Sequence, residues 1–257
     1  MNEPAYRQLA DDLRDAIRRG DHPEGSVLPR ITDLADRYGI AKQTAREAIT
    51  ILESEGLLEV VRRRGTVVRH RAVRRRLTRG RRVHRDERGY YFDATAQSWT
   101  ALSTPTVNFG SAPREIAARL GLEDGDDVLI RHRIMGDSNA EVPRQLATSY
   151  LPAALARGTR LAETDTGPGG IYDRLEEMGH RPLSWDEAVT ARTPTPAEAE
   201  ALRLPRGVPL LCVTRTTTGP DGTVLEINDT RMNAEHFEVG YPLTRTPAEQ
   251  TGRAPRA

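Results

Sequence analysis

Apolar residues between positions 28 and 68 recur at spacings that predict two short helices joined by a tight turn. Leu34, Ala35 and Tyr38 lie at helical spacing, and Gly39 follows where a chain leaving a helix most easily adopts a left-handed conformation. A second helix is expected from about Lys42 to Ser54, because its apolar residues form one stripe. That stripe consists of Ala45, Ala48, Ile49 and Leu52.

Two short β-rich runs, Leu57–Val61 and Thr66–Arg69, follow the second helix and predict a hairpin. The residues of its tip are Arg62, Arg63, Arg64 and Gly65. A helix-turn-helix followed by a hairpin with a basic tip is typical of a winged helix that reads DNA. A helical hairpin with a solvated basic loop is the alternative interpretation.

The amino-terminal end of the second helix is polar and is the candidate base-reading segment. In helix-turn-helix proteins this end enters the major groove, where Lys and Arg suit guanine and Gln suits adenine. The candidate residues there are Lys42, Gln43, Thr44 and Arg46. Lys42 is the single lysine of the chain.

A set of motifs across residues 4–70 resembles the DNA-binding domain of the GntR family of bacterial transcription regulators. These motifs are Pro4, Tyr6 and Gln8, then Leu28-Pro29, Leu34-Ala35, Tyr38-Gly39, Thr44, Arg46-Glu47-Ala48, Glu55-Gly56-Leu57 and Gly65-Thr66-Val67-Val68. The resemblance adds Arg30 and Thr32, at the start of the first of the two helices, to the expected DNA-contacting residues. The chain departs from the family at four positions. Arg30 and Ala41 replace the usual helix-capping Ser or Thr, Thr32 replaces an Arg, and Arg63 replaces the first Gly of the wing.

The formal net charge of +1 conceals an uneven distribution. Residues 61–88 carry 13 arginines against two acidic residues, whereas the flanking segments are both net acidic. Such an excess beside a winged helix is the electrostatic footprint of phosphate contact, and it predicts strongly salt-sensitive binding. Because 37 of the 38 basic residues are Arg, a compositional bias and a merely solvated linker at Arg74–Arg76 are the alternative.

An internal repeat organises the rest of the chain. The run from Leu120 to Arg133 returns 82 residues later as the run from Leu202 to Arg215, and a short helix precedes each copy. Thr195, Pro196 and Glu198 predict a capping box at the start of the second of these helices. The expected strands are Val128–Met135, Arg144–Leu151, Leu210–Thr218 and Val224–Met232. Strands joined by hairpins with helices between the pairs indicate an α+β domain on an antiparallel sheet.

This second segment, about residues 85–245, resembles the effector-binding domain of the HutC branch of the GntR family. The resemblance rests on the repeat and on Tyr150-Leu151-Pro152. It implies a chorismate-lyase-like fold, known as UTRA. It also implies a homodimer in which a small metabolite, often a phosphosugar, an amino acid or a related acid, changes the spacing of the two DNA-binding domains.

Four parts are therefore expected along the chain. They are a winged-helix domain at residues 1–70, a basic linker at 71–89, a UTRA-like effector-binding and dimerisation domain at 90–245, and a disordered tail at 246–257. The linker has little apolar periodicity and a high charge density, so we expect it to be mobile or to become ordered only on DNA.

The resemblance also names candidate effector contacts. Arg131 and Arg133 match arginines that reach an anionic group, and Tyr172 matches a position at the start of a helix. Gly170 belongs to a glycine-rich turn that opens this helix, where free backbone N–H groups suit a phosphate or carboxylate.

Four further residues are ambiguous from sequence alone. Tyr150 is either a core or a site residue, and Glu226, Asn228 and Arg231 either line the pocket or form a surface ion pair.

Composition narrows the remaining classes. With one cysteine, Cys212, and no long apolar run, we expect a cytoplasmic protein without a disulfide or a membrane partner. The six histidines show no metal-ligand spacing, and no nucleophile is paired with a base, so we expect no metal, no cofactor and no catalytic residue.

The combined prediction is a transcriptional repressor and not an enzyme. It binds a palindromic double-stranded DNA operator as a homodimer and responds to a small, anionic metabolite. The alternatives are a ligand-independent plasmid or architectural DNA-binding protein and a lyase-like enzyme.

Overall fold

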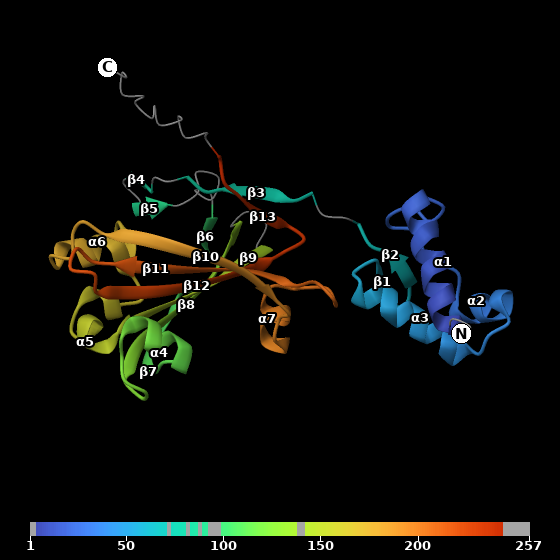
Figure 1. Cartoon of the computed structure of the whole chain (residues 1–257), viewed down its shortest axis with the longest axis horizontal. Coiled ribbons are helices and arrows are strands. Elements are labelled where there is room, and N and C mark those ends of the chain that lie inside the picture. The colour runs from blue at the N-terminus through green and yellow to red at the C-terminus, as the bar shows by residue number, and fades with distance from the viewer. Residues whose placement is uncertain are drawn as a thin grey trace, which may run out of the picture.

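The computed structural model describes residues 4–70, 73–80, 83–86, 89–91, 99–137 and 142–243, which form a helical lobe and a sheet lobe (Figure 1). The predicted tail at 246–257 and parts of the predicted linker lie outside the described residues. No helix in the described ranges is long and apolar enough to cross a membrane.

The helical lobe is the predicted winged helix. Its elements are α1 (Ala5–Arg19), α2 (Ile31–Tyr38), α3 (Lys42–Ser54), β1 (Leu58–Val61) and β2 (Gly65–Val68). Gly39 ends α2 with φ 63°, so the left-handed turn is confirmed, and α3 has the predicted bounds. Strands β1 and β2 pair antiparallel, from Leu58 opposite Val68 to Val61 opposite Gly65.

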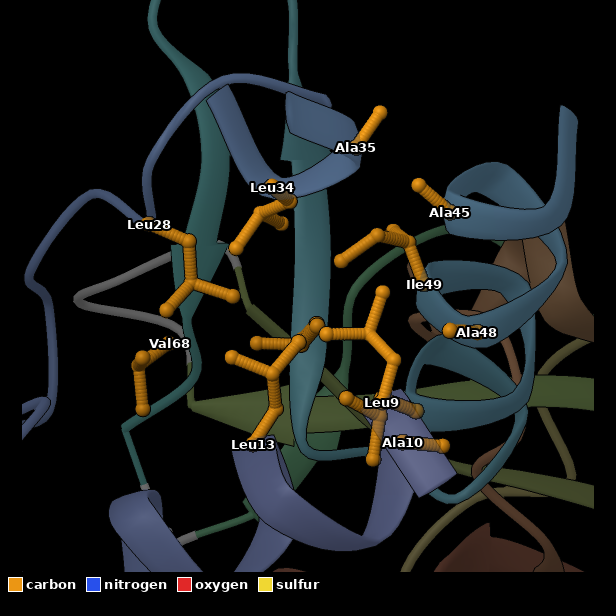
Figure 2. Close-up of a cluster of buried hydrophobic side chains, with 12 residues drawn as sticks. Leu9, Ala10, Leu13, Leu28, Leu34, Ala35, Ala45, Ala48, Ile49 and Val68 are labelled. Atoms are coloured by element: carbon orange, nitrogen blue, oxygen red, sulfur yellow. The ribbon is translucent and has the colours of Figure 1, made fainter. Parts of the chain in front are cut away.

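A single apolar core holds this lobe together. Figure 2 shows Leu9 and Leu13 of α1 among the side chains of α2 and α3. The other buried members are Ala10, Leu28, Leu34, Ala35, Ala45, Ala48, Ile49, Leu52, Leu58 and Val68. Because this set includes the whole predicted apolar stripe of α3, the opposite side of α3 is left for solvent or a partner.

The sheet lobe contains a seven-stranded antiparallel sheet with the order β10-β11-β12-β9-β8-β6, in which β7 also pairs with β8. Its strands are β6 (Trp99–Ala101), β7 (Thr106–Ser111), β8 (Asp127–Asp137), β9 (Val142–Pro152), β10 (Ser184–Arg192), β11 (Leu210–Thr218) and β12 (Val224–Asn233). The predicted α+β fold is confirmed, and the four predicted strands correspond to β8, β9, β11 and β12.

The repeat appears as two units, α4–β8–β9 and α7–β11–β12, whose last strands pair with each other. Helices α4 (Arg114–Leu120) and α7 (Pro196–Ala201) pack on one face of the sheet. The predicted capping box of α7 is present at Thr195 and Glu198. The opposite face carries α5 (Ala153–Ala156), the 3₁₀ helix η2 (Arg160–Ala162) and α6 (Gly170–Glu177).

Part of the expected mobile linker is an ordered strand. Strand β3 (Arg75–Thr78) pairs in parallel with β13 (Phe237–Gly240), the last strand among the described residues. Leu77 is only 2% exposed and packs with Met232 and Phe237. The expectation of a mobile linker is therefore wrong for this stretch, because one apolar side chain among the arginines reaches the core. Further along, β4 (His84–Asp86) pairs with β5 (Gly89–Tyr91).

The two lobes also meet directly. Arg69, just after β2, forms an ion pair with Glu235 in the turn between β12 and β13. Arg69 also donates a hydrogen bond of 3.1 Å to the carbonyl of Gly56. A cavity of about 690 Å³ lies beside this contact, lined by both lobes.

Candidate functional sites

The amino-terminal end of α3 presents polar side chains to solvent. Lys42, Gln43 and Arg46 are exposed and Thr44 is half-buried, whereas Ala45 is fully buried. Lys42 and Arg46 form no ion pair with any described residue, so their positive charges are not neutralised within the described part of the chain. An exposed, uncompensated basic helix end suits the anionic major groove.

The hairpin tip adds a second cluster of positive charge. Arg62, Arg63 and Arg64 are exposed in the turn between β1 and β2, and Gly65 is exposed at the start of β2. Arg64 Nη2 donates a 2.8 Å hydrogen bond to the carbonyl of Gly25, which holds this side chain against the loop between α1 and α2. Arg63 has φ 67°, a left-handed conformation that suits the glycine usual at this position.

Arg30 and Thr32, at the start of α2, are also exposed, and Thr32 donates a 3.2 Å hydrogen bond to Asp33. The chain just before them is tied to the wing, because the amide of Leu28 donates to the carbonyl of Thr66 at 2.8 Å. Neither Arg30 nor Ala41 makes a side-chain capping bond. The base of the wing and the approach to α2 are thus held together.

In the sheet lobe, the register brings polar residues of four strands to the face that carries α6. Arg131 is opposite Ser149, Ser149 is opposite Asn228, and Asn228 is opposite Arg215. Because alternate residues share a face, Arg133 and Glu226 lie on the same side. Six of the eight predicted effector residues share this side of the sheet: Arg131, Arg133, Glu226 and Asn228 on its strands, and Gly170 and Tyr172 on the helix that covers it.

Arg131 is the most constrained of these residues. Its side chain is 5% exposed and donates two hydrogen bonds of 2.6 Å to the carbonyls of Glu163 and Thr164. Burial, together with the charge of Arg133, lowers the pKa of Arg131 from its ordinary value. A bound anion would oppose both effects, so the site favours a negative ligand.

Arg133 is only partly satisfied. Its Nη2 donates a 2.8 Å hydrogen bond to Ser149 Oγ, which also accepts from Asn228 Nδ2 at 2.9 Å. Its buried Nε has no hydrogen-bond partner among the described residues. Neither Arg131 nor Arg133 forms an ion pair within the described ranges.

On the same face of the sheet, at the pairing of β11 and β12, a buried acid lies near a phenol. Glu226 is 1% exposed and accepts a 3.0 Å hydrogen bond from Thr217. Burial and the nearby charge of Glu226 raise the pKa of Tyr172 to about 12, so its phenol stays protonated at neutral pH. Arg215 donates a 3.5 Å hydrogen bond to the Tyr172 oxygen.

A carboxylate of the protein packs against one glycine of the turn before α6. Gly169 and Gly170 have φ 81° and 67°. A Cβ on Gly169 would lie 1.8 Å from an oxygen of Asp173, which pairs with Arg85 at 2.8 Å. The carboxylate of Asp173 thus packs against Gly169, whereas a Cβ on Gly170 would meet no atom within 4 Å, and the anion site at Gly170 stays a prediction.

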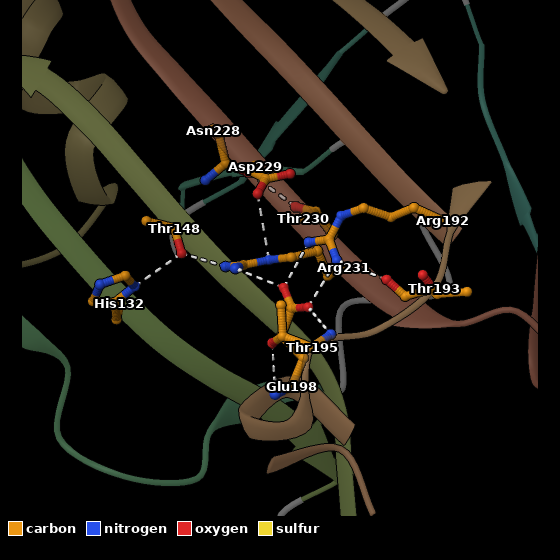
Figure 3. A network of polar contacts seen from close by, with 10 residues as sticks. All are labelled: His132, Thr148, Arg192, Thr193, Thr195, Glu198, Asn228, Asp229, Thr230 and Arg231. Atoms are coloured by element: carbon orange, nitrogen blue, oxygen red, sulfur yellow. Dashed lines mark hydrogen bonds and ion pairs between the residues drawn. The ribbon is translucent and has the colours of Figure 1, made fainter. Parts of the chain in front are cut away.

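Tyr150 and Arg231 lie on the opposite face of the sheet from Arg131 and Arg133. Tyr150 packs in the apolar cluster under α4. Arg231 contacts Thr148, Glu198 and Asp229, in the network shown in Figure 3. The structure does not bring these two residues to the other candidates. On β12, Arg231 stands at an odd position and Glu226 and Asn228 at even positions, so their side chains lie on opposite faces of the sheet.

The network around Arg231 fastens α7 to the sheet. Glu198 accepts bidentate hydrogen bonds of 2.6 and 2.7 Å from Arg192 (Figure 3). The bonds from Arg192, and then those from Thr195, lower the pKa of Glu198 to about 2. The charges of this network balance, because two arginines pair with two carboxylates: Arg192 and Arg231 with Glu198 and Asp229. We therefore assign the cluster a structural role and no ligand.

Sequence reasoning missed Ser149, Arg215 and Thr217 as members of the polar face. For Arg215 a signal existed, because the repeat aligns it with Arg133. The interlobe cavity is lined by none of the predicted effector residues. The described residues contain no cluster of three His, Cys, Asp or Glu side chains suited to a metal.

Comparisons with known proteins agree with this architecture. A family model described as bacterial regulatory proteins, gntR family, matches residues 5–68, and a UTRA domain model matches residues 106–238. The chain is 35% identical to an uncharacterised HTH-type transcriptional regulator of Streptomyces coelicolor over 87% of its length and 86% of that protein. It is 26% identical to the HTH-type transcriptional repressor NagR of Bacillus subtilis over 87% and 88%.

A crystal structure of a protein assigned to the GntR transcriptional regulators superimposes with a TM-score of 0.68 at 28% identity, covering 95% of this chain and 99% of that one. The structure of PhnF from Mycobacterium smegmatis, at 20% identity, 94% and 100% coverage and a TM-score of 0.51, shares the fold. These relatives are transcription regulators and not enzymes. The chain therefore belongs to the GntR family, in its HutC subfamily, as a DNA-binding transcription regulator with a winged-helix reader and a UTRA domain.

Proposed function

We propose that the protein is a repressor that binds a palindromic operator as a homodimer and is controlled by a small anionic metabolite in the bacterial cytoplasm. One observation carries the effector class: Arg131 and Arg133 lie side by side on one sheet face, and burial and the charge of Arg133 outweigh the opposing charge of Asp165 on the Arg131 guanidinium. Two adjacent guanidinium groups that form no ion pair with a described carboxylate favour a ligand that brings negative charge.

The dimer and the repression rest on different grounds. The relative NagR is named as a repressor, and helix-turn-helix proteins read two half-sites through two-fold symmetric dimers. The residues proposed to contact DNA lie at the start of α2, at the start of α3 and in the wing, and all but the half-buried Thr44 are exposed. They are Arg30, Thr32, Lys42, Gln43, Thr44, Arg46, Arg62, Arg63, Arg64 and Gly65.

A thermal-shift screen of the purified protein against phosphorylated and carboxylated metabolites tests this function. Anionic compounds should raise the Tm of the wild type and not of Arg133→Gln. Arg157→Gln is the control, because Arg157 is an exposed arginine of the same domain and pairs with Asp127. A hit that weakens binding to operator DNA supports the repressor. If only uncharged compounds bind, or none does, the anionic effector is wrong.

A further inference from the structure

Glu187, on strand β10, is shared by two arginines that come from different parts of the chain. Its Oε1 accepts hydrogen bonds from Arg215 Nε at 2.9 Å and Nη2 at 2.5 Å. Its Oε2 accepts a bond from Arg79 Nε at 2.9 Å. The three side chains are only 11–13% exposed, so the two ion pairs are largely withdrawn from water.

One arm of this arrangement reaches the candidate effector site. Arg215 lies opposite Asn228 in the sheet, on the face that carries Arg133. It also bonds to Tyr172 at 3.5 Å. A ligand anion between Tyr172 and Arg133 would therefore be a second acceptor within reach of the Arg215 guanidinium.

The other arm reaches the linker that leads to the DNA reader. Arg79 directly follows strand β3, and its amide donates a 2.8 Å hydrogen bond to the carbonyl of Gly240. At the other end of the strand, the amide of Arg75 donates to His236 at 2.7 Å. Glu187 thus helps to fix the end of β3 that lies farther from the winged helix in sequence.

We propose that Glu187 couples the effector site to the linker. This inference rests on the proposed function, since it needs an anion at the site. An effector that draws Arg215 toward itself removes the group that holds Glu187, and Arg79 then loses a fixed partner. Because the carboxylate that Arg79 bonds is then no longer held in one position by Arg215, the Arg79–Glu187 pair fixes the end of β3 less firmly and the linker is released.

The other linker pair lacks these properties. Arg76 pairs with Glu238, but the two side chains are 68% and 39% exposed, and ion pairs so open to water contribute little to stability. Glu238→Gln is therefore a matched control, since it removes one carboxylate bound to a linker arginine without touching the path to the effector site.

Hydrogen exchange at the amides of Arg75 and Arg79 in the full-length protein tests the coupling without any ligand. Arg215→Met and Glu187→Gln should each speed this exchange about threefold or more. The double variant should exchange no faster than the single ones, because both changes cut the same path. Glu238→Gln should leave exchange near the wild-type rate. Unchanged exchange in Arg215→Met, or multiplied effects in the double variant, would overturn the coupling. Arg215→Lys replaces the Met variant if that variant does not fold.

Inorganic phosphate is the probe that tests whether an anion at the effector site acts on the linker through Glu187. Phosphate should speed exchange of these amides in the wild type, whereas Glu187→Gln should bind phosphate in calorimetry without a change in exchange. Phosphate binding with an unaltered linker response in Glu187→Gln contradicts the coupling. Absence of phosphate binding in the wild type contradicts the proposed anion site instead, and the ligand-free exchange result still decides the coupling.

Discussion

Arg63 holds a backbone conformation that glycine adopts more readily, at the tip of the wing. Arg63→Gly should raise the free energy of unfolding, measured by urea denaturation, by about 0.5 kcal/mol. The reason is that relief of the left-handed strain outweighs the extra backbone entropy that glycine loses on folding. The same change should make the slope of log DNA affinity against log salt concentration less steep by about 0.9, the contribution of one phosphate contact. Arg62→Gly is the control, since Arg62 has no positive φ and should lose charge without gaining stability. A stabilised Arg62→Gly would contradict the strain argument.

Arg46 is the residue whose substitution should remove DNA binding and leave effector binding intact. Arg46→Ala should abolish binding to an operator selected from random DNA, because this exposed side chain lies at the base-reading end of α3. Effector binding, measured by thermal shift, should persist. Arg18→Ala, an exposed arginine on α1, removes the same charge and should retain binding. Operator binding by Arg46→Ala at wild-type affinity would show that another face reads the DNA.

At the scale of elements, Glu198 joins helix α7 to the sheet. Its pKa of about 2 lies below the unfolded value of 4.5, so its contribution is complete above pH 4.5 and is lost as the pH falls toward 2. Glu198→Gln should cost about 3 kcal/mol of unfolding free energy at pH 7, a difference that shrinks at pH 3. The exposed Glu200→Gln in the same helix should cost almost nothing. Equal losses at both pH values would refute this role.

Strand β3 depends on one apolar side chain. Leu77→Ala should cost about 2–4 kcal/mol and should speed trypsin cleavage at the linker arginines, because the buried Leu77 anchors β3 against β13. Val73→Ala is the control, since Val73 is 96% exposed. If cleavage is not faster in Leu77→Ala, the strand is held by its backbone pairing and ion pairs alone.

Across the whole molecule, the sequence sufficed where the determining interactions are local. The period of apolar residues and Gly39 predicted α2 and the bounds of α3, and the repeat predicted the α4 and α7 units. Strand β10 was not predicted, because its alternate residues Asp186, Ala188 and Thr190 are exposed and no hairpin signal precedes it.

The candidate site could be predicted only in part, for a physical reason. Which side chains share a face depends on strand register, and register is set by pairing between distant segments. Arg131 and Arg133 were grouped by resemblance, whereas Tyr150 and Arg231 proved to lie on the other face. Leu77 gave little sign of a strand, because one leucine among arginines shows no periodicity.

The parallel pairing of β3 with β13 decides where this protein can be divided. Although β3 precedes the UTRA match in sequence, its amides are bonded to β13, so it belongs to the sensor as a folded unit. A chimeric biosensor that joins this sensor to another DNA reader should therefore be spliced before Arg75. A splice placed after Arg79 would discard the strand through which the sensor is joined to the DNA reader.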